Sequence, residues 1–167
     1  MTRRLILIRW GLYGAAALFL LLVQSQILGR IGIWGVCPIV IPCIAALWAT
    51  MEPLPHGLLG SLVLGAVCDT LFTAGIPCFY VLVCLLATIL SWLTARHLVM
   101  PGLRCSALSC IEALLLSGLF SGLTMLHRGM AANAVFSLLL RESVVSLPFA
   151  LVLIHPVFSR IHRATTP

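Results

Sequence analysis

The segment Pro53–Tyr80 reads PLPHGLLGSLVLGAVCDTLFTAGIPCFY, and small or acidic residues recur in it at every fourth position. Gly57, Ser61, Gly65 and Asp69 therefore share one face of a helix, because an α-helix has 3.6 residues per turn. In a membrane, a face of small residues lets two helix backbones approach closely. We expect this face to pack against protein and to keep its carboxylate away from lipid.

The composition of the rest of the chain indicates a membrane protein. The 167 residues are 62% hydrophobic and 8% charged, with a mean hydropathy of +1.18, which is far from the profile of a soluble domain. The length is sufficient for one transmembrane domain, residues 1–167, with short connections and no soluble catalytic domain. The lipid bilayer is thus the first expected partner.

The apolar runs predict an all-α integral membrane protein, a bundle of six transmembrane helices. An uncleaved first helix is preferred to a signal peptide, because its apolar run is long enough to span and further spans follow. The expected limits of the six spans are residues 10–28, 33–50, 57–72, 78–94, 106–126 and 143–159.

Two of these spans are irregular. The second contains Pro38 and Pro42, which remove backbone donors, so it should lie against other helices rather than face lipid. Before the last span, residues 130–140 are expected to form a helix on the outer surface, followed by a span from Ser143. The alternative is a span that begins at Asn133 and buries the Arg141–Glu142 pair.

The arginines predict the orientation of the bundle. With six spans, seven of the ten arginines fall on one side of the membrane and three on or near the other. Both termini are therefore expected in the cytoplasm. The cytoplasmic set is Arg3, Arg4, Arg9, Arg96, Arg104, Arg160 and Arg163, and the outer set is Arg30, Arg128 and Arg141.

The fifth expected span carries a second pattern of small residues. Ser117-Gly118 and Ser121-Gly122 repeat at a spacing of four, as in the third span. We expect Gly118 and Gly122 to pack against the face formed by Gly57, Ser61 and Gly65.

No pattern of catalytic or metal-binding residues stands out. We find no nucleophile–base set, no H-E-x-x-H and no phosphate-binding glycine loop, so an enzyme is not expected. The seven cysteines include no C-x-x-C pair and the five histidines are scattered, which predicts neither metal nor other cofactor. The arginines lie at the ends of apolar runs, so no nucleic-acid interface is predicted.

Two acidic residues lie inside expected spans. Glu112 either meets Arg96 or Arg104 near the cytoplasmic rim or forms hydrogen bonds within the bundle. Asp69 lies near the C-terminal end of its helix, where the macrodipole disfavours an anion.

Asp69 is either a structural polar plug or a functional contact. Its depth near the outer end of the third span would bring it within reach of His127, Arg128 or Arg141. We expect Asp69 to pin an outer rim on which a periplasmic or single-span partner docks.

The stretch from Gly57 to Tyr80 resembles the signature of the bacterial rod shape-determining protein MreD family. In that family a glycine-spaced helix ends in an aspartate, here Asp69, and a short turn, here Gly75-Ile76-Pro77, leads into the next apolar span. The length, the six expected spans, the cytoplasmic termini and the basic C-terminal end agree with this resemblance.

The resemblance implies a non-enzymatic component of the cell-elongation machinery in the bacterial inner membrane. Such a protein binds the membrane-anchored MreC protein and helps couple the peptidoglycan synthase complex to the cytoskeleton. The family's fold is similar to the substrate-binding subunits of energy-coupling-factor vitamin transporters, so a vitamin-binding subunit is the alternative. Short outer turns with few polar and aromatic groups argue against that alternative. So does the first span, where Gly11 and Ala15 only loosely replace the expected Ala-xxx-Ala pair.

Overall fold

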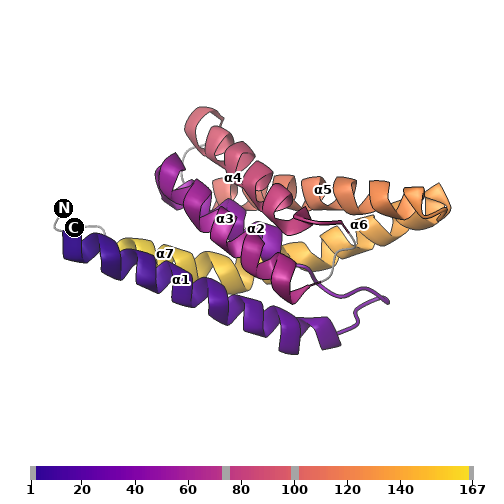
Figure 1. Ribbon diagram of the computed structural model, residues 1–167, viewed down its shortest axis with the longest axis horizontal. Coiled ribbons are helices and arrows are strands. Elements are labelled where there is room, and N and C mark those ends of the chain that lie inside the picture. The colour runs from indigo at the N-terminus through magenta and orange to yellow at the C-terminus, as the bar shows by residue number, and fades with distance from the viewer. Residues whose placement is uncertain (1–2, 73–75, 99–101, 166–167) are drawn as a thin grey trace.

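The computed structural model describes residues 3–72, 76–98 and 102–165, and these residues form seven α-helices without a β-strand (Figure 1). A 3₁₀ turn, η1 (Leu28–Arg30), follows the first helix, and a π-helical segment, η2 (Ala150–Ile154), joins the last two. The helices are α1 (Arg3–Gln26), α2 (Ile41–Met51), α3 (Leu54–Leu71), α4 (Phe79–His97), α5 (Leu103–His127), α6 (Ala132–Phe149) and α7 (His155–Thr165).

Within the described residues, five helical segments are long and apolar enough to cross a membrane. They are Ile8–Arg30, Leu54–Leu71, Phe79–His97, Leu103–His127 and Ala132–Arg163. The fold is therefore that of an all-α, multi-pass membrane protein. The remaining apolar helix, α2, has 11 residues and a length of about 16 Å, which is shorter than the hydrocarbon core of about 30 Å.

The second apolar run is irregular, as its prolines predict. Its first part turns at Trp34 and Gly35, which have φ angles of 54° and 77°, and Ile33 forms a bridge with Val36. The helix begins at Ile41, with Pro42 in its first turn, where a missing N–H is tolerated. Only residues 41–51 of this run are therefore helical, because Pro38 and Pro42 both remove donors that a helix through them would need.

Side chains from two other helices bind the non-helical backbone before α2. Gln24 of α1 donates from Nε2 to the carbonyl of Pro38 at 2.8 Å and accepts from the N–H of Val40 at 3.0 Å. The N–H of Ile39 donates to Ser146 Oγ of α6 at 2.8 Å. Non-helical backbone is tolerated at membrane depth only where its polar groups find partners within the protein. These three bonds meet that requirement.

Helix α2 lies in the middle of the bundle, against α3, α4, α5 and α7 (Figure 1). Every residue from Cys43 to Ala49 is at most 5% exposed. The expectation that the second run lies against other helices is confirmed.

The small-residue face of α3 packs against α2 and α4. Gly57 lies against Ala49 and Thr88, and Ser61 is fully buried. A Cβ on Gly65 would lie 2.5 Å from Val81 Cα, so the backbones of α3 and α4 are in direct contact there. The short connection between these two helices makes them antiparallel neighbours.

Gly118 and Gly122 lie in a different contact from the one expected. Both face Leu139 of α6, because α5 and α6 form the next antiparallel pair along the chain. The expected pairing of Gly118 and Gly122 with the Gly57 face was therefore wrong. Gly118 and Gly122 pack within the α5–α6 hairpin, and Gly65 packs within the α3–α4 hairpin.

The last part of the chain is one long helix, from Ala132 through η2 into α7. The helix does not break at Arg141 and Glu142, so the expected outer surface helix with a separate span from Ser143 was wrong. The segment Ala132–Arg163 has 32 residues, about 48 Å, which is longer than the hydrocarbon core. It begins close to Asn133, as in the alternative considered from the sequence.

Candidate functional site

The α3–α4 hairpin contains the residues that carry the family resemblance. Gly65 allows α4 to approach, and Asp69 follows one turn later on the same face of α3. Its Oδ1 accepts from the N–H of Tyr80 at 3.0 Å, and its Oδ2 accepts from the N–H of Val81 at 3.2 Å. Close packing at Gly65 therefore places the carboxylate over the first turn of α4.

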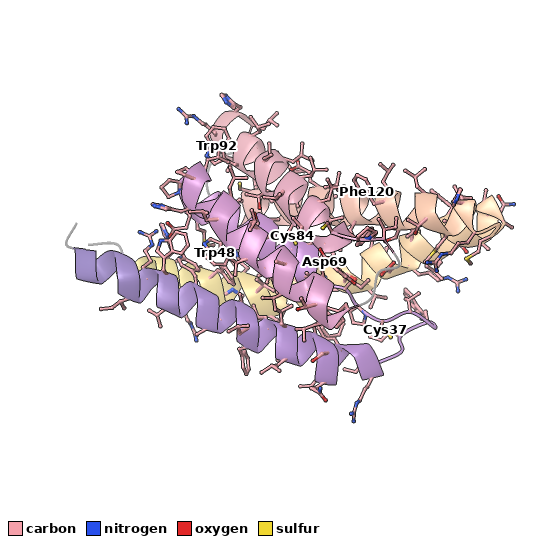
Figure 2. All side chains as sticks on the ribbon, in the orientation of Figure 1. Cys37, Trp48, Asp69, Cys84, Trp92 and Phe120 are labelled. Atoms are coloured by element: carbon pink, nitrogen blue, oxygen red, sulfur yellow. The ribbon has the colours of Figure 1, made fainter. Side chains whose placement is uncertain are left out.

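This position explains why a carboxylate is acceptable in this part of the bundle. The first amides of a helix have no partner within the helix, and the macrodipole is positive at that end. Asp69 is at the unfavourable end of α3 but at the favourable end of α4. Figure 2 shows Asp69 far from Trp92, which lies near the other end of α4.

The expected ion pairs of Asp69 are not formed. Arg128 ends α5 and is exposed, and Arg141 is exposed on α6. Within the described residues, the ion pair recorded is Arg9–Glu52, and no cation is paired with Asp69. The expectation was wrong because it considered only the dipole of α3. It did not consider that the first amides of α4, those of Tyr80 and Val81, lie next to Asp69.

Arg128 nevertheless lies at the same rim as the hairpin turn. A cavity of about 410 Å³ extends from Ile76, which precedes α4, to the last turns of α5. The α5 residues that line it are Phe120, Leu123, Thr124, His127 and Arg128. This rim cavity is lined by the apolar side chains of Ile76, Phe120 and Leu123 and by the cation Arg128. Arg141 is not among its lining residues.

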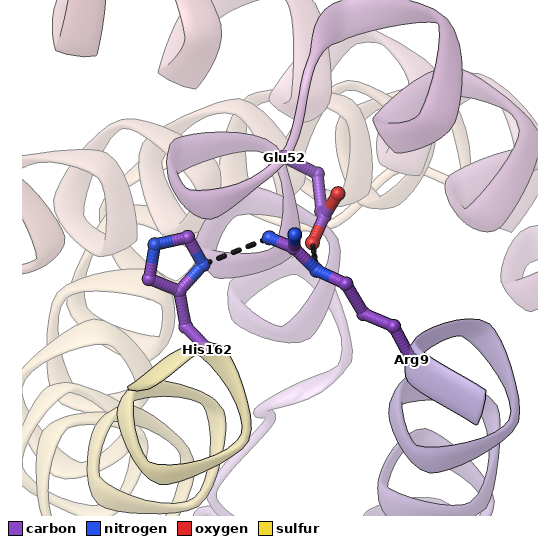
Figure 3. A network of polar contacts seen from close by, with 3 residues as sticks. All are labelled: Arg9, Glu52 and His162. Atoms are coloured by element: carbon purple, nitrogen blue, oxygen red, sulfur yellow. Dashed lines mark hydrogen bonds and ion pairs between the residues drawn. The ribbon is translucent and has the colours of Figure 1, made fainter. Parts of the chain in front are cut away.

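A second polar centre lies at the opposite end of the bundle, where α1 runs beside α7 (Figure 1). Figure 3 shows that Arg9 of α1 forms an ion pair with Glu52, which follows α2. The same guanidinium donates from Nη2 to Nδ1 of His162 on α7 at 3.0 Å. A guanidinium can only donate, so Nδ1 of His162 is the acceptor in this bond.

Aromatic rings surround this ionic centre. Tyr13 stacks on Trp48 with ring centroids 5.5 Å apart and contacts Phe158 at 5.3 Å. Trp10 contacts His56 at 5.3 Å. The rings exclude water from the Arg9–Glu52 pair, which strengthens it.

We did not predict this centre from the sequence. The available signal was that Glu52 and Arg9 are a carboxylate and a guanidinium at the polar ends of their apolar runs.

Glu112 forms its contact within the bundle. Thr94 of α4 donates from Oγ1 to the carboxylate of Glu112, at 2.7 Å from Oε1 and 2.9 Å from Oε2. Arg96 instead lies over the ring of Trp92, 5.1 Å from its centroid. Of the two alternatives for Glu112, hydrogen bonding within the bundle is the one observed.

The described part of the chain contains no group of three His, Cys, Asp or Glu side chains placed to hold a metal ion. No protein-family model, curated protein or solved structure matches the chain. Function therefore has to be inferred from the residues and their geometry.

Proposed function

We propose that the chain is a non-enzymatic membrane scaffold of the bacterial cell-elongation machinery, with the role of an MreD protein. In this role it binds an MreC-like single-span membrane protein and couples the peptidoglycan synthase complex to the cytoskeleton. The observation that carries the proposal is the α3–α4 hairpin. The residues that resemble the family signature, Gly65 and Asp69, form one connected contact with the start of α4.

The proposed location is the bacterial inner membrane, with six crossings and both termini in the cytoplasm. In support, α1 and α7 lie side by side, and Arg9 near the start of α1 contacts His162 near the end of α7. An even number of crossings would follow if the run from Ile31 to Met51 also crosses. After the turn at Trp34 and Gly35, residues 37–40 at up to about 3.3 Å each and α2 of about 16 Å together reach about 29 Å, close to the hydrocarbon core of about 30 Å.

The proposed contact surface for the partner is the outer rim. The rim cavity joins the turn before α4 to the end of α5, so a segment bound there would contact both hairpins. Its apolar floor suits an aliphatic or aromatic side chain of the partner. Arg128 at its edge suits a neighbouring carboxylate, which would orient that segment.

The test is copurification with the MreC-like protein encoded by the same genome, carrying an affinity tag. The wild-type chain should be retained in a defined ratio to the partner. Arg128→Glu should reduce its retention at least fivefold, because it reverses the charge at the rim. Arg160→Glu, a matched reversal at an exposed position of α7, should leave retention unchanged. Failure of the wild-type chain to copurify, or equal retention of all three chains, would contradict the proposal.

A vitamin-binding subunit is the second candidate, and the rim cavity is the observation that favours it. Its volume of about 410 Å³ falls within the range of about 300–1,000 Å³ typical of small-ligand sites. Retention of a labelled vitamin by the purified chain, or copurification with an energy-coupling ATPase module, would favour this candidate over the scaffold.

A further inference from the structure

A second cavity lies at the end of the bundle where α1 runs beside α7. It has a volume of about 460 Å³ and lies between the end of α2, the first turn of α5 and one face of α7. Six of its ten lining residues carry a polar or basic side chain. The lining residues are Thr50, Met51, Gly102, Leu103, Cys105, Ser106, His155, Ser159, His162 and Arg163. We call it the basal cavity.

One face of α7 supplies the charge of the basal cavity. His155, Ser159, His162 and Arg163 are spaced by four, three and one residues, so they lie on the same side of the helix. Phe158, one turn before His162 and next to it on the helix surface, is fully buried in the core. The side of α7 that carries His155, Ser159 and Arg163 lines the cavity with imidazole, hydroxyl and guanidinium groups.

Among the described residues, no carboxylate lines the basal cavity. Glu52 is in the ion pair with Arg9. An anion in the cavity would therefore meet a guanidinium and two imidazoles, with no acidic side chain among the described lining residues.

Two serine hydroxyl groups lie at the cavity. Ser106 of α5 is 3% exposed, and its Oγ lies 3.1 Å from Nδ1 of His155, so an imidazole of α7 and a hydroxyl of α5 meet at the cavity wall. Ser159 lines the cavity from α7, and its hydroxyl donates to the carbonyl of Pro156 at 3.2 Å. The adjacent first turn of α5 has no acidic residue and no side-chain cap among the described residues. The positive end of the α5 macrodipole therefore makes the electrostatic potential in the cavity more positive.

From the cavity, the guanidinium and imidazole groups that line it and its buried hydroxyl group, we propose that the basal cavity binds a phosphate group. The volume lies in the range of small-ligand sites, and Arg163 provides the bidentate geometry that phosphate oxygens prefer. Two sources supply this chemistry at a membrane surface, the headgroup of an anionic phospholipid and a free phosphate. The cavity opens beside Arg160 and Arg163, at the basic end of the bundle, where anionic lipids concentrate.

The test measures the thermal stability of the purified full chain in neutral detergent at constant ionic strength. Three additions are compared: dioleoyl phosphatidylglycerol, dioleoyl phosphatidylcholine and inorganic phosphate. We expect a saturable rise in the midpoint with phosphatidylglycerol and none with phosphatidylcholine. A comparable rise with inorganic phosphate would mean that the phosphate group alone is recognised, and its absence would assign the site to the lipid headgroup.

Two variants of α7 separate a site from general charge attraction. Arg163→Gln removes a cation that lines the cavity, whereas Arg160→Gln removes an exposed cation on the same helix that does not line it. We expect Arg163→Gln to raise the half-saturating concentration of phosphatidylglycerol about tenfold, because a tenfold change corresponds to the free energy of about one charge-assisted hydrogen bond. Ser106→Ala should raise it by a smaller factor.

Two results would overturn the proposal. One is an equal effect of Arg160→Gln and Arg163→Gln, because binding would then reflect the net charge alone. The other is the absence of any saturable stabilisation of the wild-type chain by phosphatidylglycerol and by inorganic phosphate. Neither result depends on the scaffold role, which the copurification experiment tests separately.

Discussion

Substitution of Gly65 by alanine would disturb the α3–α4 contact at its closest point. The added Cβ would lie 2.5 Å from Cα and 2.8 Å from N of Val81, and 3.0 Å from the carbonyl oxygen of Tyr80. All three atoms belong to the backbone, so no side chain can rotate out of the way. Ordinary contacts between carbon atoms are about 3.5–4.0 Å, so α4 would have to move away by about 1 Å.

This displacement also breaks the contact of Asp69 with α4. Its bonds to the Tyr80 and Val81 amides are 3.0 and 3.2 Å long, and an extra ångström takes both beyond hydrogen-bond distance. Overpacking costs about 1–3 kcal/mol, and losing a hydrogen bond to a charged group costs about 1.5–3 kcal/mol. We expect a total loss of about 3 kcal/mol, or about 6–12 °C in the unfolding midpoint for a chain of this size.

The assay is reversible unfolding of the purified chain in detergent, with Asp69→Asn and the double variant completing a cycle. The two changes disrupt the same contact, so the double variant should be less destabilised than the sum of the single variants by about 1 kcal/mol or more. Gly118→Ala is the matched control, because its Cβ would meet only Leu139 Cδ2, at 3.8 Å. Wild-type stability of Gly65→Ala, or strict additivity with Asp69→Asn, would refute this account of the hairpin.

Two further substitutions test contacts that the sequence did not reveal. Gln24→Leu leaves a buried carbonyl and a buried N–H of the segment before α2 without partners, so it should lower the free energy of unfolding by about 2–4 kcal/mol. The control is Gln26→Leu at an exposed position, which should change the free energy of unfolding by less than about 0.5 kcal/mol. Equal effects of these two changes on urea-induced unfolding would contradict the role of Gln24. Arg9→Met leaves the carboxylate of Glu52 buried without its partner and should cost about 3 kcal/mol. Glu52→Gln should cost less, because Arg9 keeps its bond to the α7 imidazole, and the reverse order in thermal unfolding would be inconsistent with the network.

The sequence predicted the long apolar helices because hydrophobic length alone identifies a span. Residues 57–72, 78–94 and 106–126 were expected, and the helices are Leu54–Leu71, Phe79–His97 and Leu103–His127. Four of these six ends extend further than expected, because polar residues can occupy the terminal turns of a membrane helix. Arg96 and His97, for example, are in the last turn of α4, where the macrodipole favours cations.

The partners of the small-residue faces were harder to predict. A repeat of glycine and serine indicates that a backbone will approach, but it carries no information about which backbone. Gly57 and Gly118 carry the same signal, but Gly57 packs against Ala49 of α2 and Thr88 of α4, and Gly118 packs against Leu139 of α6. The short connections between consecutive helices were the stronger guide to pairing, because short loops join antiparallel neighbours.

Asp69 shows the same limit for an acidic residue. Asp69 lies near the C-terminal end of α3, where the macrodipole is unfavourable for an anion, and a cation was therefore expected as its partner. The partner is the start of the next helix, which becomes a partner only once the turn and the glycine contact are both in place. A carboxylate at the end of one membrane helix can therefore be stabilised by the first amides of the next, without any opposite charge.

The segment before α2 extends this reasoning to backbone groups that no helix satisfies. Pro38 has no N–H, so this stretch has one donor fewer to satisfy, and Gln24 and Ser146 accept those of Val40 and Ile39. The amide of Gln24 offers a donor and an acceptor side by side, as a neighbouring β-strand would. One buried side chain thus replaces part of a strand and allows α2 to begin deep in the bundle, where its residues contact five other helices. The prolines that prevent a continuous second span are therefore part of what places α2 at the centre of the fold.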